Sequence, residues 1–487
     1  RITIMKRKIA LALTMAMLGT CLAGCGQVDT DTNASTEAAG TAAAETTESE
    51  KEWYGTEDGK TITLHFWGGV QPEYGYDDLC ANFNEEYKDK GLQVEYVRYV
   101  NDDNGNLQLE TYLMGGGDVD LFIGYGGRAK MDKRVDSNLL LDMSGMLNDI
   151  GFNLDDELGV ANMAEYHYDD GAVYGFPTKY ENSRWILINE DMFKEAGLDI
   201  PYDGWTYSEF LAAAEKLTHG EGQDKVYGVC WARKQSGNSI LNALDAVLGA
   251  NQIYKNEEGT EVNFDNDVYR AGLNLVKETL DKGYAIPIED EFSEDLSVAN
   301  TFLQGKCAIM LGVAQMRLCM DQENYPHDFM TALVPAPVPD DEKYNTEFYR
   351  KQIGTTGAGD LLSISANTKY PEASFEFAMW YLKGGMSPLV QGGRIPLWNG
   401  VNKDEVLSVL KEKAQGSIDM DSMENYLSLD TTQGVAAIKG NASSEISSAW
   451  FEEFDAMCYG KQSVDQTVQN MEKRGNELIQ TELSSQK

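Results

Sequence analysis

Two hydrophobic patterns alternate in the first folded segment, and their order restricts the fold more than any other feature. Apolar residues occupy every second position in 61–67 and again in 92–96, whereas residues 76–87 place them at helical spacing. Three glycines at 115–117 precede another apolar run at 119–123. Strands with helices between them predict an α/β fold, with a parallel sheet that is covered by helices on its faces.

The carboxyl ends of parallel strands meet at one edge of the sheet, and ligands bind outside that edge. In this chain the edge is formed by the loops that begin at Trp67 and at Gly124. Both loops follow directly on predicted strands. The sequence therefore predicts a ligand site among these loops.

A second region that alternates strands with helices follows. A strand is expected at 185–188 and a short helix at 191–196. Thr206 and Glu209 stand at the spacing of a capping box, in which each side chain accepts a backbone N–H group at the start of a helix. A helix is therefore expected to begin there. Further helices are expected after Pro371 and in the C-terminal segment.

The length and the charge of the chain restrict its class. At 487 residues and 54.0 kDa, the chain is long enough for more than one hydrophobic core. Its 79 acidic residues outnumber its 40 lysines and arginines, which gives a net charge of -39. A surface of this sign repels phosphate backbones and anionic lipid headgroups. Nucleic acid is therefore not an expected partner.

The N-terminal residues have the composition of a targeting signal. Basic residues at 6–8 precede an apolar run at 9–18 that is too short to span a membrane as a mature helix. Small residues then precede Cys25, a pattern that resembles the lipobox of bacterial lipoproteins. We expect a signal peptide over residues 1–24 and lipidation of Cys25, with cleavage as a plain secreted protein as the alternative. Residues 25–52, which carry few apolar side chains, are expected to form a disordered tether.

Cysteine and histidine give no sign of a metal site or a cofactor. The seven cysteines contain no Cys-x-x-Cys pair, and the four histidines lie far apart in the sequence. The sequence also lacks Gly-x-Ser-x-Gly, His-Glu-x-x-His and phosphate-loop motifs. We therefore expect no metal ion, no cofactor and no enzymatic activity. A secreted glycoside hydrolase stays open as an alternative, because its paired carboxylates are defined by their separation in space.

Short motifs follow one another along the folded part. In chain order they are residues 64–69, 115–122, 170–177, 188–198, Trp205 with the capping box, 305–310, 335–337 and 392–396. In this order and spacing they resemble the carbohydrate-type extracellular solute-binding proteins of bacterial ABC importers, the family that includes maltose-binding protein. The resemblance extends over nearly all of residues 60–480.

The resemblance implies a two-lobe periplasmic-binding-protein-like α/β fold, with hinge crossings and a ligand cleft between the lobes. The expected lobe boundaries are 53–174 and 355–399 for lobe 1, and 175–354 and 400–487 for lobe 2. The crossings are expected near Gly175, near residues 354–359 and near Asn399.

The resemblance also implies the function. Such a protein captures an extracellular saccharide, here expected to be an oligosaccharide, and delivers it to the permease subunits of an ABC importer. We expect a monomer outside the cytoplasm that is held at the bacterial membrane only by its N-terminal lipid. A ligand-binding lipoprotein that serves a sensor is the other alternative.

A sugar site needs carboxylates and amides for the hydroxyl groups and aromatic rings for the C–H faces. Trp67 and Tyr125 end predicted strands, and Glu181 matches a position where the family often has an acid. For the two rings the alternative is packing in the core, and for Glu181 it is exposure to solvent. The predicted ligand-binding residues are Trp67, Tyr125, Glu181, Trp231, Gln315, Arg394 and Trp450.

The last four of these residues have competing interpretations. Trp231 lies in a predicted short strand, where packing in the core is favoured. Trp450 matches an aromatic residue that stacks on sugar in some relatives, and plain packing is its alternative. Gln315 stands where many relatives have the tryptophan of Gly-Pro-Trp, so an amide replaces a stacking ring. Arg394 either reaches the cleft or caps a turn beside Gly393, and the turn is favoured.

Overall fold

The strands form two separate sheets. The computed structural model describes residues 53–485 except for 101–102, 245–246, 249–252, 257, 353–357, 430–439 and 441. Its strands are β1 (Ile62–Gly68), β2 (Leu92–Arg98), β3 (Leu121–Gly124), β4 (Phe176–Tyr180), β5 (Trp185–Asn189), β6 (Tyr227–Cys230), β7 (Cys307–Leu311), β8 (Thr331–Pro335), β9 (Ala358–Ile364) and β10 (Ile395–Pro396). The first sheet has the order β10-β4-β9-β3-β1-β2 and the second has the order β6-β7-β5-β8.

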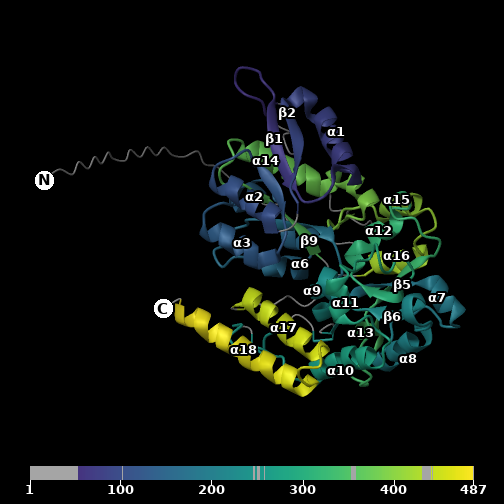
Figure 1. Ribbon diagram of the computed structural model, residues 1–487. Helices are drawn as coiled ribbons and strands as arrows, with labels where there is room; N and C mark the ends of the chain where they lie inside the picture. Colours follow the sequence, from purple (N-terminus) through teal and green to yellow (C-terminus); the bar gives the residue numbers. More distant parts are fainter. Residues whose placement is uncertain are drawn as a thin grey trace, which may run out of the picture. The chain divides into compact units, whose positions relative to one another are not determined.

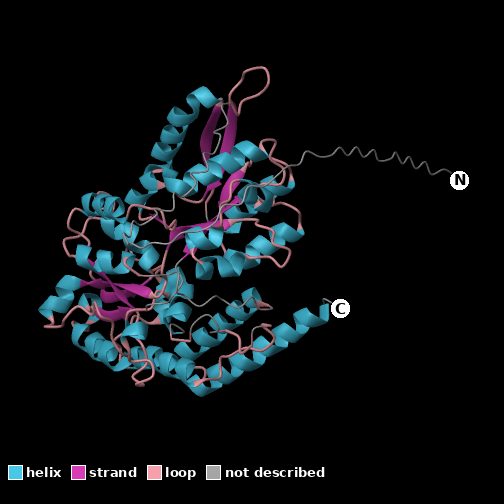
Figure 2. Ribbon diagram, turned by 180° about the vertical axis from the view of Figure 1, so that it is seen from behind, coloured by secondary structure: helices cyan, strands magenta, loops and turns pink. Residues whose placement is uncertain are grey.

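Helices surround both groups of strands (Figure 2). Those before β4 are α1 (Tyr76–Tyr87), α2 (Asp103–Met114), α3 (Gly127–Asp136), α4 (Ser144–Asp149), α5 (Leu154–Leu158) and α6 (Val160–Met163). Those between β5 and β9 are α7 (Glu190–Glu195), α8 (Tyr207–Leu217), α9 (Arg233–Leu244), α10 (Asp267–Asp281), α11 (Ile288–Ser293), α12 (Met316–Met320) and α13 (Glu347–Arg350). The others are α14 (Pro371–Trp380), α15 (Lys403–Ala414), α16 (Met420–Leu427), α17 (Ser443–Cys458) and α18 (Val464–Ser485).

The expected parallel pairing is found in β1, β2 and β3. β1 pairs in parallel with β2 and with β3, so that Phe66 lies opposite Tyr96 on one side and Leu121 on the other. β9, however, is antiparallel to both of its neighbours, β3 and β4, and β10 is antiparallel to β4. The first sheet is therefore mixed. The prediction of an α/β fold with two sheets is confirmed.

Phe66 lies at the centre of the core on one face of the first sheet. Ile62, Leu64 and Phe66 are all buried, as their alternation in the sequence predicts. The ring of Phe66 meets Tyr76 of α1 at a centroid distance of 6.0 Å and Phe377 of α14 at 5.2 Å. Such tilted ring pairs stabilise a core beyond the burial of their area. These ring contacts join β1, early in the chain, to α14, which lies about 300 residues later.

The capping box at the start of α8 is confirmed. The N–H of Glu209 donates to the Thr206 hydroxyl at 3.3 Å, and the N–H of Thr206 donates to the Glu209 carboxylate at 2.7 Å. Two N–H groups that the helix itself leaves without partners are thus satisfied. The local sequence alone was sufficient to place this helix start.

The first crossing between the sheets lies later than expected. The expected boundary at residue 175 falls just before β4, yet β4 pairs with β9 and β10 in the first sheet. β5, which begins at Trp185, pairs with β7 and β8 in the second sheet. We therefore propose that the first crossing is at residues 181–184. The expected crossing at 354–359 falls largely outside the described residues.

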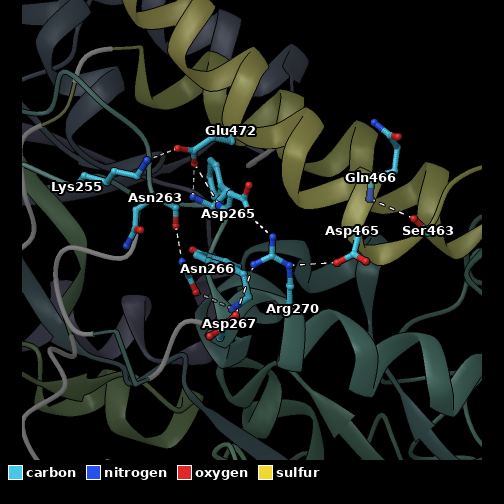
Figure 3. A network of polar contacts seen from close by, with 12 residues as sticks. Lys255, Asn263, Asp265, Asn266, Asp267, Arg270, Ser463, Asp465, Gln466 and Glu472 are labelled. Carbon is cyan, nitrogen blue, oxygen red and sulfur yellow. Dashed lines mark hydrogen bonds and ion pairs between the residues drawn. The ribbon is translucent and has the colours of Figure 1, made fainter.

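Charged side chains fasten the C-terminal helices to the rest of the second region. α17 and α18 lie side by side, and α18 also packs against α10 (Figure 1). Glu472 of α18 pairs with Lys255 and accepts the N–H of Phe264 at 2.8 Å and that of the following residue at 3.2 Å. Arg270 of α10 donates to Asp465 at 3.2 Å (Figure 3). The loop before α10 and the start of α10 are thus held by α18.

We predict that Glu472→Ala lowers the free energy of unfolding by about 1–3 kcal/mol, because two backbone N–H groups lose their acceptor. The matched control is Lys473→Ala on the same helix, whose side chain is 75% exposed and 3.9 Å from Glu477. That variant should stay within about 0.5 kcal/mol of the wild type. Urea unfolding of the three proteins measures the difference, and equal stabilities would contradict the role of Glu472.

Candidate functional site

The carboxyl edge of the first sheet bears a cavity of about 480 Å³, which we call the edge cavity. β3 and β4 end at this edge and β9 begins there, since Gly124 lies opposite Leu361 and Tyr180 lies opposite Ala358. It is the edge where the sequence predicts a ligand site. The lining residues are Gly124, Tyr125, Gly126, Gly127, Tyr166, Glu181, Ser183, Ala358, Gly359, Asp360 and Leu361.

Tyr125 joins the ends of β1 and β3. Its hydroxyl accepts the N–H of Gly69 at 3.2 Å, so the hydroxyl keeps its own proton to donate elsewhere. Burial raises the pKa of Tyr125 well above its ordinary value, and the nearby carboxylate of Asp360 raises it further. Tyr125 therefore lines the cavity as a neutral side chain.

Two carboxylates in the edge cavity are paired with two cations. Lys179 forms an ion pair with Glu181 and lies 3.9 Å from Asp360. Arg394 donates from Nε to Asp360 Oδ2 at 2.9 Å. All four side chains are largely buried, with 12% of Lys179, 25% of Glu181, 6% of Asp360 and 11% of Arg394 exposed. They form one row of alternating charges at the ends of β4, β9 and β10.

The row of charges keeps Asp360 ionised. Burial disfavours the carboxylate, but Lys179 and then Arg394 outweigh the burial and lower the pKa of Asp360 below its ordinary value. Burial likewise disfavours the guanidinium of Arg394, and Asp360 more than compensates, so that the pKa of Arg394 is raised. Asp360 also has a backbone φ of 53°, in the left-handed region that is costly for side chains other than glycine. A fixed, charged acceptor is thus held at the cavity wall.

The start of α3 adjoins the same cavity through Gly126 and Gly127. The partial positive charge of a helix start attracts anions. Here the carboxyl group of Glu165 takes that place, because its Oε1 accepts the N–H of Arg128 at 3.4 Å. The guanidinium of Arg128 lies over the ring of Tyr168 at 3.8 Å and donates to the carbonyl of Glu165. One N–H group of the helix start is therefore already bound from within the chain.

The structure brings together three of the predicted ligand-binding residues. Tyr125 and Glu181 line the edge cavity, and Arg394 lies directly behind it, bound to Asp360. The favoured interpretation of Arg394 as the cap of a turn misses this ion pair. Sequence reasoning also missed Asp360 and Lys179. For Asp360, the available signal is an acid that follows glycines and directly precedes the apolar residues of a strand.

Trp67 faces the core and not the edge cavity. It is 4% exposed, its ring lies 4.8 Å from that of Tyr112, and its Nε1 donates to the carbonyl of Asp118 at 2.8 Å. A buried tryptophan with its N–H satisfied by a neighbouring loop is a packing residue. The ligand role of Trp67 stays a prediction without support from this geometry.

The other three predicted residues do not line the edge cavity. Trp231 follows the end of β6, is 2% exposed and donates to Thr279 at 3.0 Å, in keeping with the favoured place in the core. Trp450 is 1% exposed and stacks on Phe454 at 4.9 Å in the hydrophobic core. Gln315 lies just before α12, and its buried Oε1 has no hydrogen-bond partner among the described residues.

A family comparison decides what kind of protein carries this site. The model of the bacterial extracellular solute-binding proteins matches residues 68–383, which is well over half of the chain. The chain belongs to this family. The resemblance expected from the sequence motifs is therefore confirmed.

Solved structures show the fold of this solute-binding protein in relatives of low sequence identity. An ABC substrate-binding protein from Listeria monocytogenes in complex with cycloalternan is 18% identical, with a TM-score of 0.66 over 86% of this chain and 98% of that chain. The GacH receptor of Streptomyces glaucescens, solved unliganded and with acarbose, is 16% identical, with a TM-score of 0.63 over 86% and 99%. A sugar transporter from Rhizobium etli in an open conformation is 17% identical, with a TM-score of 0.63 over 86% and 99%.

The described part of this solute-binding protein was also searched for membrane-spanning helices, metal sites and disulfides. None of its described helices is long and apolar enough to cross a membrane. Among the described residues, no three His, Cys, Asp or Glu side chains group as a metal site. The described cysteines, at 80, 230, 307, 319 and 458, are free thiols.

The second sheet has a buried acid at its own carboxyl edge, where β6 passes into α9. Glu291 of α11 is 1% exposed, accepts the N–H of Lys234 at 3.3 Å and lies 3.7 Å from the thiol of Cys230. Burial raises the pKa of Glu291 to about 7, and the hydrogen bonds only partly oppose this. The native protein thus holds a proton on this carboxyl group at pH values where the unfolded chain has lost it.

We predict that this proton makes the stability depend on pH. Because the pKa of Glu291 is about 7 in the native state and about 4.5 in the unfolded chain, stability falls as the pH rises through that window. The loss is on the order of 3 kcal/mol. Glu291→Gln should remove this slope, whereas Glu289→Gln, at an exposed position on the same helix, should keep it. Urea unfolding at pH 5 and pH 8 measures the slope, and parallel slopes in wild type and Glu291→Gln would contradict the assignment.

Proposed function

We propose that this protein captures an extracellular saccharide, specifically an oligosaccharide, at the edge cavity and delivers it to the permease of an ABC importer. The observation that carries the proposal is the wall of the edge cavity, which combines the neutral ring of Tyr125 with the carboxylates of Glu181 and Asp360. Hydroxyl groups of a sugar donate to carboxylates, and its C–H faces pack on rings. The complexes of the Listeria and Streptomyces relatives with cycloalternan and acarbose support the same class of ligand.

The edge cavity also bears on the glycoside hydrolase alternative. Glu181 and Asp360 both line it, and hydrolysis of a glycosidic bond needs one carboxyl group with a raised pKa that donates a proton to the leaving oxygen. The pKa of Asp360 is instead lowered by its paired cations. This supports binding without hydrolysis. Service to a sensor instead of a permease uses the same cavity and stays the second alternative.

Ligand capture in this proposal involves two lobes. We propose that the first sheet, with its helices, forms lobe 1 and that the second sheet, with α17 and α18, belongs to lobe 2. Glu181 and Ser183, which line the cavity, lie in the crossing at 181–184. A ligand that contacts both lobes shifts the equilibrium between open and closed forms by its difference in affinity for the two.

The cellular setting is a further part of the proposal. Cys25 and the expected signal peptide and tether lie outside the described residues. We propose that Cys25 carries a lipid that anchors the protein outside the cytoplasm, and that the protein acts as a monomer. The net charge of -39 supports the exclusion of nucleic acid as a partner.

We predict that Tyr125→Ala weakens saccharide binding by about tenfold or more, because the ligand loses a ring contact and its buried area. Trp67→Ala should instead lower the free energy of unfolding by about 3–5 kcal/mol, as the loss of a core tryptophan does. Calorimetric titration with a glycan panel, together with urea unfolding, separates the two effects. Phe348→Ala is the control, because its ring is 48% exposed and does not line the cavity.

The panel also tests the ligand class itself. A wild-type protein that binds amino acids, peptides or metal ions but no glycan would overturn the saccharide assignment. Release of shortened glycans during the titration would move the protein to the hydrolases. Loss of binding in Trp67→Ala without loss of stability would show that this ring contacts ligand after all.

A separate prediction concerns the anchor. Cys25→Ala should leave the protein uncleaved by lipoprotein signal peptidase and without acyl label, because the thiol that accepts the lipid is gone. Metabolic labelling with a fatty acid in a bacterial host measures this. Cys80→Ala, which changes a thiol in α1, should be labelled like the wild type. Equal labelling of Cys25→Ala and the wild type would contradict the anchor.

A further inference from the structure

Two arginines stand beside the edge cavity, and only one of them has a carboxylate partner. Arg394 is paired with Asp360 at 2.9 Å. Arg317 of α12 is half-buried and lies against Gly393, the neighbour of Arg394; a Cβ atom at residue 393 would be 3.1 Å from the Cβ of Arg317. The guanidinium of Arg317 lies over the ring of Tyr74, 5.7 Å from the ring centre, and forms no ion pair with a described acid. Arg317 is thus a cation without a counter-ion of its own.

The acids that could pair with Arg317 are bound to other groups. Asp321, which directly follows α12, accepts the hydroxyl of Tyr74 at 3.1 Å. The charge of Arg317 also acts on Asp360, but that carboxylate is hydrogen-bonded to Arg394. Neither acid therefore serves as the partner of Arg317.

The pKa values of the two arginines differ in direction for this reason. Burial lowers the pKa of Arg394, but Asp360 outweighs the burial and raises it. Burial, and then the charge of Arg394, lower the pKa of Arg317, and no carboxylate is among the main groups that act on it. A partly buried charge without a counter-charge is costly to the fold. Such uncompensated groups are candidates for binding sites.

A second cation adjoins the cavity from α3. Lys130 is half-buried and lies against Gly126, which lines the cavity; a Cβ atom at residue 126 would be 2.7 Å from the Cδ of Lys130. No described acid forms an ion pair with Lys130, and Glu165, near the start of the same helix, accepts the N–H of Arg128 instead. Lys130 and Arg317 thus come from different elements, and both are cations without a counter-ion at this edge.

From this arrangement we infer that the saccharide bound at the edge cavity carries a negatively charged group, such as the carboxylate of a uronic acid, and that Arg317 is its partner. The inference rests on the proposed function and narrows its class of ligand to acidic saccharides. Planar guanidinium groups bind carboxylates through two parallel hydrogen bonds. Hydroxyl groups of the same ligand donate to Glu181 and Asp360, whose own charges are balanced by Lys179 and Arg394.

The net charge of the chain does not oppose this assignment. At -39 it repels an acidic sugar at long range. At physiological ionic strength, however, that field is screened beyond about 8 Å, whereas a partly buried pair is screened much less. Local cations therefore decide whether an anionic group is bound.

The experiment compares matched ligands by calorimetric titration at physiological salt. Each oligosaccharide of a neutral panel, such as maltotriose and cellotriose, is paired with counterparts in which one hydroxymethyl group is oxidised to a carboxylate. At least one counterpart should bind more tightly than its neutral sugar by about tenfold or more. Arg317→Gln should abolish most of this preference while neutral sugars bind as before. Lys133→Gln, which makes the same charge change at an exposed position of α3, should keep it.

A second variant guards against a loss of folding. Arg317→Met also removes the charge, but its side chain keeps the packing of the aliphatic stem, and it should lose the same preference. Urea unfolding of each variant checks the fold. Both variants should unfold at a urea concentration close to that of the wild type, because no carboxylate loses its partner.

The outcomes separate this inference from the function on which it rests. Neutral sugars that bind as tightly as all of their acidic counterparts, or more tightly, would overturn the acidic class and leave saccharide capture standing. A preference for acidic sugars that is unchanged in both variants would remove Arg317 as its cause. Failure of every neutral and acidic sugar to bind would overturn the proposed function itself.

Discussion

The edge cavity depends on the insertion of β9 between β3 and β4. β9 is antiparallel to both neighbours, so its first residues lie beside the last residues of each. The Thr178 hydroxyl donates to the carbonyl of Asp360 at 2.9 Å, although the two residues are 182 positions apart. This set of strand pairings places Asp360 at the cavity wall and brings Glu181, which directly follows β4, to the same edge. The long excursion of the chain through the second sheet, between β4 and β9, is what allows the insertion.

The buried ion pairs at the cavity hold their side chains in place more than they stabilise the fold. A buried ion pair loses hydration on both sides, and its attraction often does no more than offset that loss. Removal of one partner is costly, however, because the other is left buried and alone. Asp360 is further restricted by its left-handed backbone and Arg394 by its place beside the short strand β10. The row of charges therefore fixes the direction of two carboxylates toward the cavity, which is the property that hydrogen bonding to a ligand requires.

Local patterns in the sequence were enough for some parts of the structure and not for others. The alternation in β1, the capping box of α8 and the strand end at Tyr125 each depend on neighbours in the sequence, and all were found there. The pairing of Asp360 with Arg394 joins residues 34 positions apart, and the sequence carries no local trace of it. Trp67 ends a strand at the expected edge, but its burial depends on an acceptor at Asp118 and on the ring of Tyr112. The sequence alone therefore does not show whether a large aromatic ring at a strand end contacts a ligand or packs in the core. The loop that faces the ring decides this.

The buried indoles have a consequence for spectroscopy. Trp67, Trp185, Trp231 and Trp450 are all less than 5% exposed, whereas Trp53 is 40% exposed. Indoles in apolar surroundings emit at shorter wavelengths than indoles in water. The intrinsic fluorescence of this protein therefore reports on the packing of its cores, and a red shift marks unfolding. Since no tryptophan is among the described residues that line the edge cavity, an extrinsic fluorophore beside that cavity is the better optical reporter of occupancy.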